Sequence, residues 1–510
     1  MSPVETNPQP RHLLPAADRN VVAIRCGERT RSWADVEERA IRLGKVLETD
    51  VGPGSSWAVL AHNDVEWAEW LVGNGRAGTR LVPLNWHLTA AEMASILVDS
   101  ETRLVLAGPG LEGLAAEAAA LAGIDSVVNQ ATDYEAWLAA ESSDPTELAD
   151  RPAGTPMFFT GGTTGRSKGV VRSDQHLPVA EFKSLWSGWG ALARKPNQGT
   201  TLITTPLYHA LGFAVMAASL SAGCEVVLHE RFDPIATLSA IESHRVTCTP
   251  MVPTQFIRLL KLDTEIRDRY DLSSLEWVLH SAAPCPEWAK RAMIDWFGPV
   301  LFELYGSSEG TGPAICDSHE WLAKPGTVGK ASARVSYSIV DAEGNDLPPG
   351  EVGTIYCRRT DGPPAYHNDP EKTRAMVLPD GRFTVGDMGW LDEDGYLFLA
   401  DRRVDLIIVG GSNVYPAEIE ATLIEHPDVA DVAVFGLPDP DWGERIVAVV
   451  EPPPECDPDV DGIRAWASDR LAAYKVPRRF DVVDALPREA HGKLKKRLLR
   501  DRYLGQDAKG

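Results

Sequence analysis

The chain has 510 residues, more than one ordinary domain holds, so two or more domains are expected. Apolar residues make up 44% and charged residues 24%, which predicts a sizeable buried core and argues against long disorder. The formal net charge of -23 disfavours nucleic acid and anionic membranes as partners of the whole surface, because like charges repel. The stretch 475–502 is instead rich in Lys and Arg, which indicates either a solvated helix face or a patch that meets an anionic cosubstrate.

The seven cysteines are scattered and form no C-x-x-C pair, which disfavours a disulfide framework and a structural zinc site. Residues 1–16 are interpreted as a loose Pro-rich lead-in without a signal peptide. The long stretch 202–224 lacks charge but carries Pro206, His209 and Gly212, so it predicts a strand, loop and helix and not a membrane span. We therefore expect a cytoplasmic protein without integral membrane association.

The first half of the chain has the pattern of layered α/β structure. A helix is predicted to begin at Ser32, because Ser32 and Asp35 match a capping box. The apolar residues that follow share one helix face: Trp33, Val36, Ala40, Leu43 and Leu47. Short apolar runs predict buried strands at 57–62, 80–85, 226–230 and 277–281, and they alternate with helices such as 111–121. This alternation predicts parallel α/β layers.

The pattern of the sequence changes after about residue 335, where it predicts short alternating strands separated by turns. A new unit then begins near residue 405, with helices predicted at 416–425 and 462–472 and strands at 429–437 and 445–451. We predict an α/β fold with two domains. Residues 1–402 form a large domain of layered α/β subdomains plus a small β-barrel-like region, and residues 403–510 form a small mobile α+β domain.

The most specific local signal is the loop within 158–171, which combines four glycines, three threonines and Lys168. Glycines let backbone N–H groups approach a polyphosphate, and the hydroxyls and the lysine add donors and charge. An ordinary Gly-rich turn seldom carries this set. The loop lacks G-K-[ST] and G-x-G-x-x-G, so it is neither the P-loop motif nor the dinucleotide fingerprint.

At this loop the chain resembles the adenylate-forming superfamily, which includes acyl-CoA synthetases, luciferases and peptide-synthetase adenylation domains. Gly161 replaces the usual Ser of the family loop, and Ser167 replaces the usual Pro. Four further stretches resemble family motifs in family order: 304–310, 385–403, 410–420 and 486–500. The sequences of 280–286 and 296–310 most resemble the branch of the family that couples bile acids, steroid side chains or terpenoid acids to CoA.

The resemblance implies an ATP-dependent acid–CoA ligase that forms an acyl-adenylate and then a thioester, with ATP, Mg²⁺ and coenzyme A as cofactors or cosubstrates. The implied ATP-binding residues are Thr160, Gly161, Gly162, Thr163, Thr164, Gly165, Lys168, Ala282, Ala283, Tyr305, Gly306, Ser307, Ser308, Asp387, Arg402 and Lys493. Catalysis is assigned to Lys493, Glu309, Lys168 and His209, and the metal to Thr164 and Glu309. The expected acyl pocket contains His209, Phe213, Ser281, Ala282 and Gly306, and the expected CoA contacts are Gly410, Gly411 and Arg478.

Charge supports this reading, because a carboxylate that attacks the α-phosphate brings two anions together. The Lys493 ammonium can offset that repulsion, and loss of one such group typically costs on the order of 10²–10³ in rate. A solvated-face role for Lys493 is the alternative, since Lys495, Lys496 and Arg497 surround it.

The predicted hinge departs from the family pattern. The family commonly has a charged residue where this chain has Val404, next to Arg403. In the family, the small domain rotates after adenylation and exchanges its lysine face for the face of Gly410 and Gly411. Val404 therefore makes the site of that pivot uncertain without affecting the adenylation step.

Other functions fit the sequence less well. Residues 306–310 match the G-x-S-x-G elbow of hydrolases, but Thr311, Gly312 and Pro313 disfavour the helix that an elbow needs. A non-catalytic homologue would be expected to lack Glu309 or Lys493, and both are present. An acyl-AMP ligase that loads a carrier protein stays open, because its catalytic residues would be the same.

The expected substrate is a bulky, hydrophobic acid, because the predicted pocket is apolar and has no obvious charged anchor. Steroid-like or terpenoid acids lead, and fatty or aromatic acids follow as alternatives. The expected partners are this acid, CoA and, in the alternative, a carrier protein. A homodimer is among the expected assemblies, since the family often forms oligomers.

Overall fold

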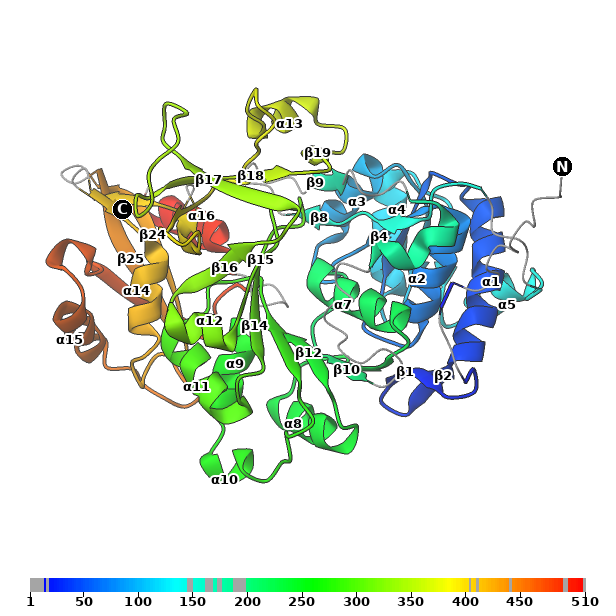
Figure 1. The fold of residues 1–510 in the computed structure, drawn as a ribbon, viewed down its shortest axis with the longest axis horizontal. Helices are drawn as coiled ribbons and strands as arrows, with labels where there is room; N and C mark the ends of the chain where they lie inside the picture. Colours follow the sequence, from blue (N-terminus) through cyan, green and yellow to red (C-terminus); the bar gives the residue numbers. More distant parts are fainter. Residues whose placement is uncertain are drawn as a thin grey trace.

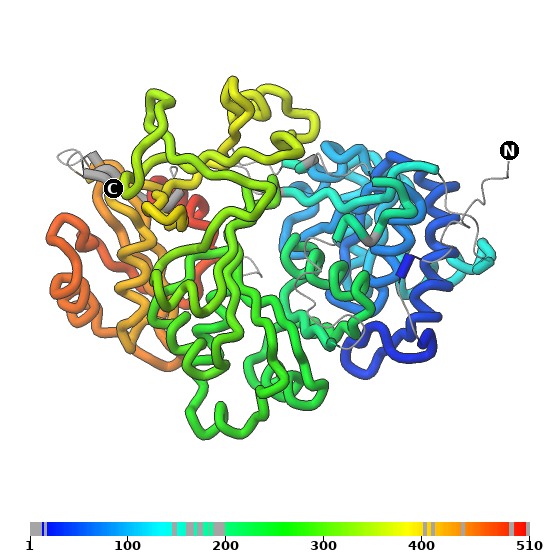
Figure 2. The backbone as a smooth tube through the Cα atoms, viewed as in Figure 1, coloured from blue at the N-terminus to red at the C-terminus, as the bar shows by residue number. Residues whose placement is uncertain are grey.

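The computed structural model describes residues 13–14, 18–144, 150–160, 168–171, 177–186, 199–402, 405–409, 412–439, 443–488 and 494–507. Two large α/β layers lie side by side, and a small domain flanks the second layer (Figures 1 and 2). The α/β fold with a large N-terminal and a small C-terminal part is therefore confirmed.

The first layer is a parallel five-stranded sheet covered on both faces. Its strands, in spatial order, are β6 (Val127–Asn129), β5 (Thr102–Ala107), β3 (Ser56–Leu60), β4 (Arg80–Pro83) and β7 (Thr155–Pro156). Helices α1 (Trp33–Asp50) and α2 (Glu66–Ala77) share a core with one face, and α3 (Ala90–Asp99) and α4 (Glu112–Ala122) with the other. A short helix, α5 (Tyr134–Ala139), packs on α1.

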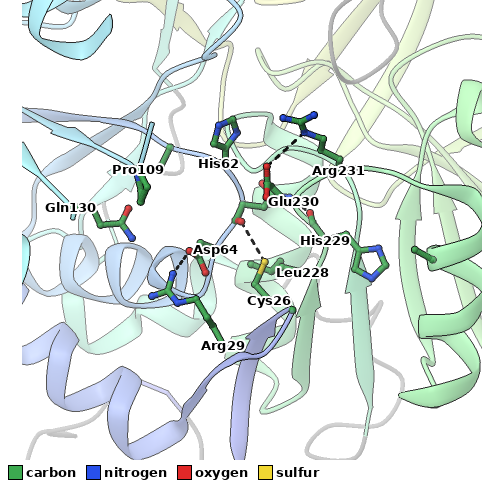
Figure 3. A pocket seen from close by; sticks show the side chains of 14 residues that line it. Cys26, Arg29, His62, Asp64, Pro109, Gln130, Leu228, His229, Glu230 and Arg231 are labelled. Atoms are coloured by element: carbon green, nitrogen blue, oxygen red, sulfur yellow. Dashed lines mark hydrogen bonds and ion pairs between the residues drawn. The ribbon is translucent and has the colours of Figure 1, made fainter. Parts of the chain in front are cut away.

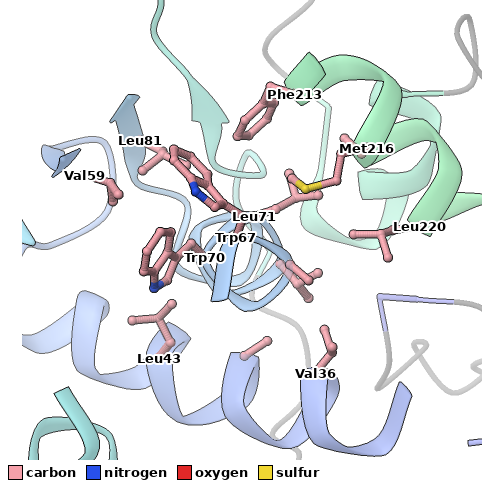
Figure 4. Packing of buried hydrophobic residues seen from close by; sticks show 14 of the residues in the cluster. Val36, Leu43, Val59, Trp67, Trp70, Leu71, Leu81, Phe213, Met216 and Leu220 are labelled. Carbon is pink, nitrogen blue, oxygen red and sulfur yellow. The ribbon is translucent and has the colours of Figure 1, made fainter. Parts of the chain in front are cut away.

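Helix α1 begins as the sequence predicts, because the Ser32 side chain accepts a hydrogen bond from the Asp35 N–H and the Asp35 carboxylate accepts one from the Ser32 N–H. The buried face of α1 meets α2, where Trp67 and Trp70 pack among aliphatic side chains (Figure 4). The two helices pack closely at Gly73, since a Cβ there would lie 2.8 Å from Leu43 Cδ2.

The second layer belongs to a 13-stranded sheet whose first part is mostly parallel. Parallel pairing joins β1 (Val22–Cys26), β11 (Glu225–Leu228), β10 (Thr200–Ile203), β12 (Cys248–Met251), β13 (Trp277–His280) and β14 (Leu301–Tyr305), and β2 (Arg29–Ser32) adds an antiparallel edge. The helices of this part are α7 (Ala210–Ser221), α8 (Pro234–Ser243), α9 (Pro253–Leu260), α10 (Thr264–Arg267), α11 (Glu287–Phe297) and α12 (Ser318–Ala323). The predicted strand, loop and helix at 202–224 are thus β10, its following loop and α7.

The sheet continues as antiparallel strands that surround a small core of their own. These strands are β15 (Ala314–Asp317), β16 (Thr327–Ala331), β21 (Leu397–Arg402), β20 (Asp387–Leu391), β18 (Gly353–Arg359) and β17 (Val335–Val340). Strand order ends at β17, so the hydrogen-bonded pairs of the described residues do not close this region into a barrel.

The small domain contains a mixed five-stranded sheet. Its strands are β23 (Ser412–Val414), β22 (Ile407–Val409), β25 (Gly443–Glu451), β24 (Asp431–Asp439) and β26 (Arg479–Val482), and its helices are α14 (Pro416–Leu423), α15 (Val460–Arg470) and α16 (Lys496–Asp507). Its core contacts Ile257 and Trp288 of the large domain, and Lys261 Nζ donates to the Ala430 carbonyl at 3.3 Å. The predicted domain boundary after residue 402 stays a prediction, because residues 403–404 lie outside the described residues.

All seven cysteines have free thiols, in agreement with the sequence prediction. Among the described residues, no helix combines the length and the apolar character needed to cross a bilayer.

Replacing Gly73 by Ala should destabilise the protein by about 1–3 kcal/mol, because the new methyl group would collide with Leu43 near its backbone. Gly113→Ala in α4 is the matched control, since no atom lies within 4 Å of its added Cβ. The midpoint of thermal unfolding should fall for Gly73→Ala and stay unchanged or rise slightly for the control. Equal midpoints would show that α1 and α2 can separate at no cost.

Candidate active site

The predicted phosphate loop joins two strands of a small antiparallel sheet. Strands β8 (Phe159–Thr160) and β9 (Lys168–Val171) pair with each other, and β19 (Ala365–Tyr366) pairs with the far side of β9. Thr160 lies opposite Lys168 in this ladder. The side chain of Thr160 lies outside the described part of the chain. The same holds for the loop residues Gly161, Gly162, Thr163, Thr164 and Gly165.

Lys168 is held at the base of this hairpin by a carboxylate from a distant segment. Its Nζ lies 3.1 Å from Asp369 Oδ2. Asp369 also caps helix α13 (Pro370–Met376), where its side chain accepts from the Lys372 N–H at 3.0 Å. The Lys372 N–H and then Lys168 lower the pKa of Asp369, so this carboxylate stays charged near neutral pH.

Glu309 lies in the loop after β14 and is largely buried. Its Oε1 accepts a hydrogen bond from the Tyr366 hydroxyl at 3.1 Å, and Tyr366 belongs to β19 of the hairpin sheet. Tyr366 therefore joins Glu309 to the small sheet that contains Lys168.

No group of three His, Cys, Asp or Glu side chains in the described part of the chain could hold a metal ion. Mg²⁺ in nucleotide sites is usually bound by one or two carboxylates together with substrate phosphates. A carboxylate at Glu309, bonded to Tyr366 of the strand that pairs with β9, fits that kind of ligation.

Tyr305 is the last residue of β14, and it is bonded to β20 of the same sheet. Its hydroxyl donates to Asp387 Oδ2 at 2.8 Å, and burial, followed by the charge of Asp387, raises the pKa of Tyr305 well above its usual value. Asp387 in turn lies opposite Arg402 in the β20–β21 ladder, although the side chain of Arg402 lies outside the described part. The predicted adenine and ribose residues are thus neighbours.

The loop after Tyr305 contains no helix, as the sequence predicts, and β15 follows at Ala314. Gly306, Ser307 and Ser308 are half-buried in this loop. A Cβ at Gly312 would lie 2.4 Å from the Tyr305 carbonyl oxygen, so the turn requires glycine there. The absence of a helix from this turn removes the basis for a nucleophile elbow.

A second loop follows β13 and lies next to β14. Ser281 Oγ donates to the Leu304 carbonyl at 2.7 Å, which ties this loop to the end of β14. Ala282 is exposed and has φ = 76°, a conformation that costs energy in any residue with a side chain, and Ala283 follows it half-buried. Such strain is common at binding sites.

His209 caps α7 in an aromatic environment that reaches the first sheet. Its ring lies 4.3 Å from that of Tyr208, and Tyr208 meets Trp86 edge-on at 6.3 Å. Trp86 in turn lies 4.7 Å from the ring of His62. Sequence reasoning missed Trp86 and His62, because no local pattern links either residue to the loop before α7.

Phe213, which was predicted to line the acyl pocket, lies in the main hydrophobic core. It is fully buried there, near Trp67 (Figure 4). Its ring contacts Trp67, Phe158 and Trp186 at centroid distances of 6.2, 5.5 and 5.9 Å. It therefore supports α7 from within the core, and its contact with an acyl group stays a prediction.

Asn63 joins the two large layers at the base of the His209 loop. Its Nδ2 donates to the carbonyls of Thr205 and His229, each at 3.0 Å, and its Oδ1 accepts from the Leu207 N–H at 2.8 Å. Asn63 follows β3, Thr205 follows β10 and His229 follows β11. One buried amide thus fixes three strand ends.

A cavity of about 670 Å³ opens beside Asn63, at the carboxyl ends of β1, β3, β5, β6 and β11 (Figure 3). Ligands of open α/β sheets usually bind at such ends. Arg29 pairs with Asp64 across this cavity, and Cys26 Sγ donates to the Asn63 carbonyl at 3.5 Å. Burial raises the pKa of Cys26 to about 12, so this thiol is not a nucleophile near neutral pH.

Several predicted residues of the small domain lie outside the described residues: Lys493, Gly410, Gly411, Arg403 and Val404. Arg478 is exposed just before β26, and its N–H donates to the Ile446 carbonyl. Burial and then the charge of Lys495 lower the pKa of His87.

Replacing Asn63 by Ala should destabilise the protein by at least about 2 kcal/mol, because it leaves buried backbone groups of Leu207, Thr205 and His229 without partners. Asn345→Ala, in an exposed turn where the side chain bonds Asp341, is the control and should cost much less. Thermal unfolding followed by circular dichroism measures both. A control-sized effect at residue 63 would contradict the proposed junction.

Comparison with known proteins identifies the family of this chain. The family model described as "AMP-binding enzyme" matches residues 15–366, and the "AMP-binding enzyme C-terminal domain" matches residues 418–493. An indoleacetate–CoA ligase from Aromatoleum aromaticum is 36% identical over 93% of both chains. A fatty acid–acyl-carrier-protein ligase, ScoC, from Streptomyces coeruleorubidus is 31% identical over 96% of this chain and 94% of its own. A CoA ligase for a methyl-dioxo-octahydroindenyl propanoate from Rhodococcus jostii is 32% identical over 94% of this chain and 95% of its own.

Solved structures agree with the sequence relatives. ATP-bound MatB from Rhodopseudomonas palustris matches with TM-score 0.81 at 29% identity, over 96% of this chain and 97% of its own. Apo MatB matches over the same shares with TM-score 0.70. The o-succinylbenzoate–CoA synthetase of Bacillus subtilis with its acyl-adenylate matches with TM-score 0.80 at 28% identity, over 94% and 95% of the two chains. The chain therefore belongs to the AMP-binding enzyme family, the adenylate-forming superfamily that its motifs predicted.

Proposed function

We propose that this enzyme is an ATP-dependent acid–CoA ligase of the AMP-forming type. The observation that carries the proposal is the convergence of Lys168, Glu309, Tyr305 and Asp387, from three separate segments, around the hairpin and the end of β14. This set supplies an ammonium group for phosphates, a carboxylate for a metal, and an aromatic ring with an acidic partner for a nucleoside.

In the first half-reaction, a carboxylate oxygen of the acid attacks the α-phosphorus of ATP. The bond from that phosphorus to the bridging oxygen breaks, and pyrophosphate leaves. Lys168 and Lys493 would offset the charge that builds up, with the Gly and Thr residues at 160–165 contacting the phosphates. Bound Mg²⁺, ligated by Glu309 and Thr164 in this proposal, would neutralise phosphate charge.

The nucleoside would be held between the two loops after β13 and β14. We assign adenine contacts to Tyr305, Ala282 and Ala283, and ribose contacts to Asp387 and Arg402. Tyr305 already donates to Asp387, so the ring and the carboxylate are held in place together. Ser307 and Ser308 would lie near the α-phosphate.

In the second half-reaction, a thiol sulfur attacks the acyl carbonyl carbon, AMP leaves, and the thiol loses its proton. We propose CoA as this thiol, with Gly410, Gly411 and the exposed Arg478 on the small-domain side. The carrier-protein ligase among the relatives keeps a carrier protein as the alternative acceptor.

For the acid, we propose a bulky, largely apolar molecule with one or more rings. The rings of Trp86, Tyr208 and His209 lie in consecutive contact at the start of α7, where we propose the acyl group binds. Aromatic side chains favour ring-containing ligands. The indoleacetate and octahydroindenyl-propanoate ligases among the relatives are named for acids of this kind, and fatty acids stay the alternative.

The small domain is proposed to move between the half-reactions about Arg403 and Val404. The whole structure matches ATP-bound MatB with a higher TM-score than apo MatB, and this difference is the support for an arrangement suited to adenylation. We further propose a cytoplasmic enzyme, and a homodimer as its assembly.

The function is tested by mass spectrometry of purified protein with ATP, magnesium and a panel of steroid-like, terpenoid, indole, aromatic and fatty acids, with and without CoA. We expect acyl-AMP without CoA and acyl-CoA with it, for a ring-containing acid. Acyl-AMP that persists with CoA would favour a carrier protein. No adenylate and no ATP binding would contradict the proposal.

The hinge proposal gives a separate prediction. Val404→Pro should leave adenylation nearly unchanged and reduce thioester formation at least about tenfold, because proline fixes one backbone dihedral at the pivot. Val404→Lys, which restores the family's charged residue, is the matched control and should keep both steps. Pyrophosphate exchange and CoA-dependent product formation measure the steps separately, and equal loss of both would argue against a pivot here.

A further inference from the structure

We propose that Tyr366 is a positioning residue for Glu309, and that its hydroxyl holds this carboxylate in the orientation that binds metal–nucleotide. The inference rests on the proposed function, because it assumes that Glu309 contacts the metal. Tyr366 is not among the residues that sequence motifs single out.

Tyr366 is fixed on every side. Its backbone pairs with Val170 of β9, and its N–H donates to Thr373 Oγ1 at 3.0 Å. Its ring packs in a small core with Val170 and Phe383, and Lys372 Nζ lies 4.1 Å from the ring centroid. The hydroxyl can therefore reach Glu309 from one direction only, at 3.1 Å.

Glu309 needs such support because of where it lies. It belongs to the loop between β14 and β15, so no strand ladder fixes its backbone, yet it is only 9% exposed. A buried carboxylate is costly unless hydrogen bonds satisfy it. A neutral phenol can orient the carboxylate without adding a charge that would compete with a cation.

The same short segment also holds the other phosphate-facing group. Three residues after Tyr366, Asp369 pairs with Lys168 at 3.1 Å. Segment 366–369 thus contacts both the proposed metal ligand and the proposed phosphate lysine. Partners that orient metal ligands typically change metal affinity or activity 10- to 100-fold when removed.

Tyr366→Phe separates this role from packing, because it keeps the ring and removes the hydroxyl alone. Tyr396→Phe is the matched control, since the Tyr396 hydroxyl donates to the Glu320 carboxylate at 3.3 Å, away from the hairpin sheet. We expect both variants to keep the unfolding temperature of the wild type within a few degrees.

The test is the affinity of the full-length protein, with a non-hydrolysable ATP analogue, for Mn²⁺ measured by electron paramagnetic resonance. Tyr366→Phe should bind Mn²⁺ about tenfold more weakly, and Tyr396→Phe should match the wild type. In a Glu309→Gln background, Tyr366→Phe should have no further effect, because the two residues then act through one ligand.

Wild-type Mn²⁺ affinity in Tyr366→Phe would overturn the positioning role and leave the proposed function intact. An additive loss in the Glu309→Gln background would overturn it as well, since the hydroxyl would then act elsewhere. A wild-type protein that binds no Mn²⁺–nucleotide would overturn both this inference and the proposed function.

Discussion

The active site depends on one buried amide, the side chain of Asn63, which joins two independently built sheets. It bonds the chain after β10 and the chain after β11 from its own position after β3. Because all three groups are backbone atoms, the junction sets the relative position of the sheets independently of the side chains around it. The ring contacts from His62 through Trp86 and Tyr208 to His209 connect the segments that follow β3, β4 and β10.

The nucleotide side of the site has a comparable organisation, with a three-stranded sheet as its frame. Strand β19 comes about 200 residues after β9 in the sequence, and their pairing brings Tyr366 and Asp369 to the phosphate hairpin. The Tyr366 hydroxyl donates a hydrogen bond to Glu309. On another pair of strands, the Tyr305 hydroxyl donates one to Asp387. Lys168, Glu309 and Asp387 are thus each contacted by a residue from a distant part of the chain. The candidate site can therefore form only when the large domain has folded.

The sequence was most informative where function and local structure coincide. The capping box of α1 and the helix-free turn after Tyr305 were both predictable, because glycines, prolines and capping residues act through neighbouring backbone. The roles of Asn63, Trp86 and Tyr366 were not predictable, since they arise from contacts between strands far apart in sequence. The predicted contact of Phe213 with the acyl group stays a prediction, and the structure adds only that three aromatic rings surround Phe213 in the core. The domain boundary and the small-domain assignments stay predictions.

The central claim is that a carboxylate oxygen attacks the α-phosphate of ATP. It is tested most directly by supplying the preferred acid with heavy oxygen in its carboxylate, together with ATP, Mg²⁺ and CoA, and analysing the released nucleotide. The account predicts AMP that carries one heavy oxygen, because that oxygen stays on phosphorus when the thiol displaces AMP. Heavy oxygen in inorganic phosphate, with ADP as the nucleotide product, would show attack on the terminal phosphate and contradict the account.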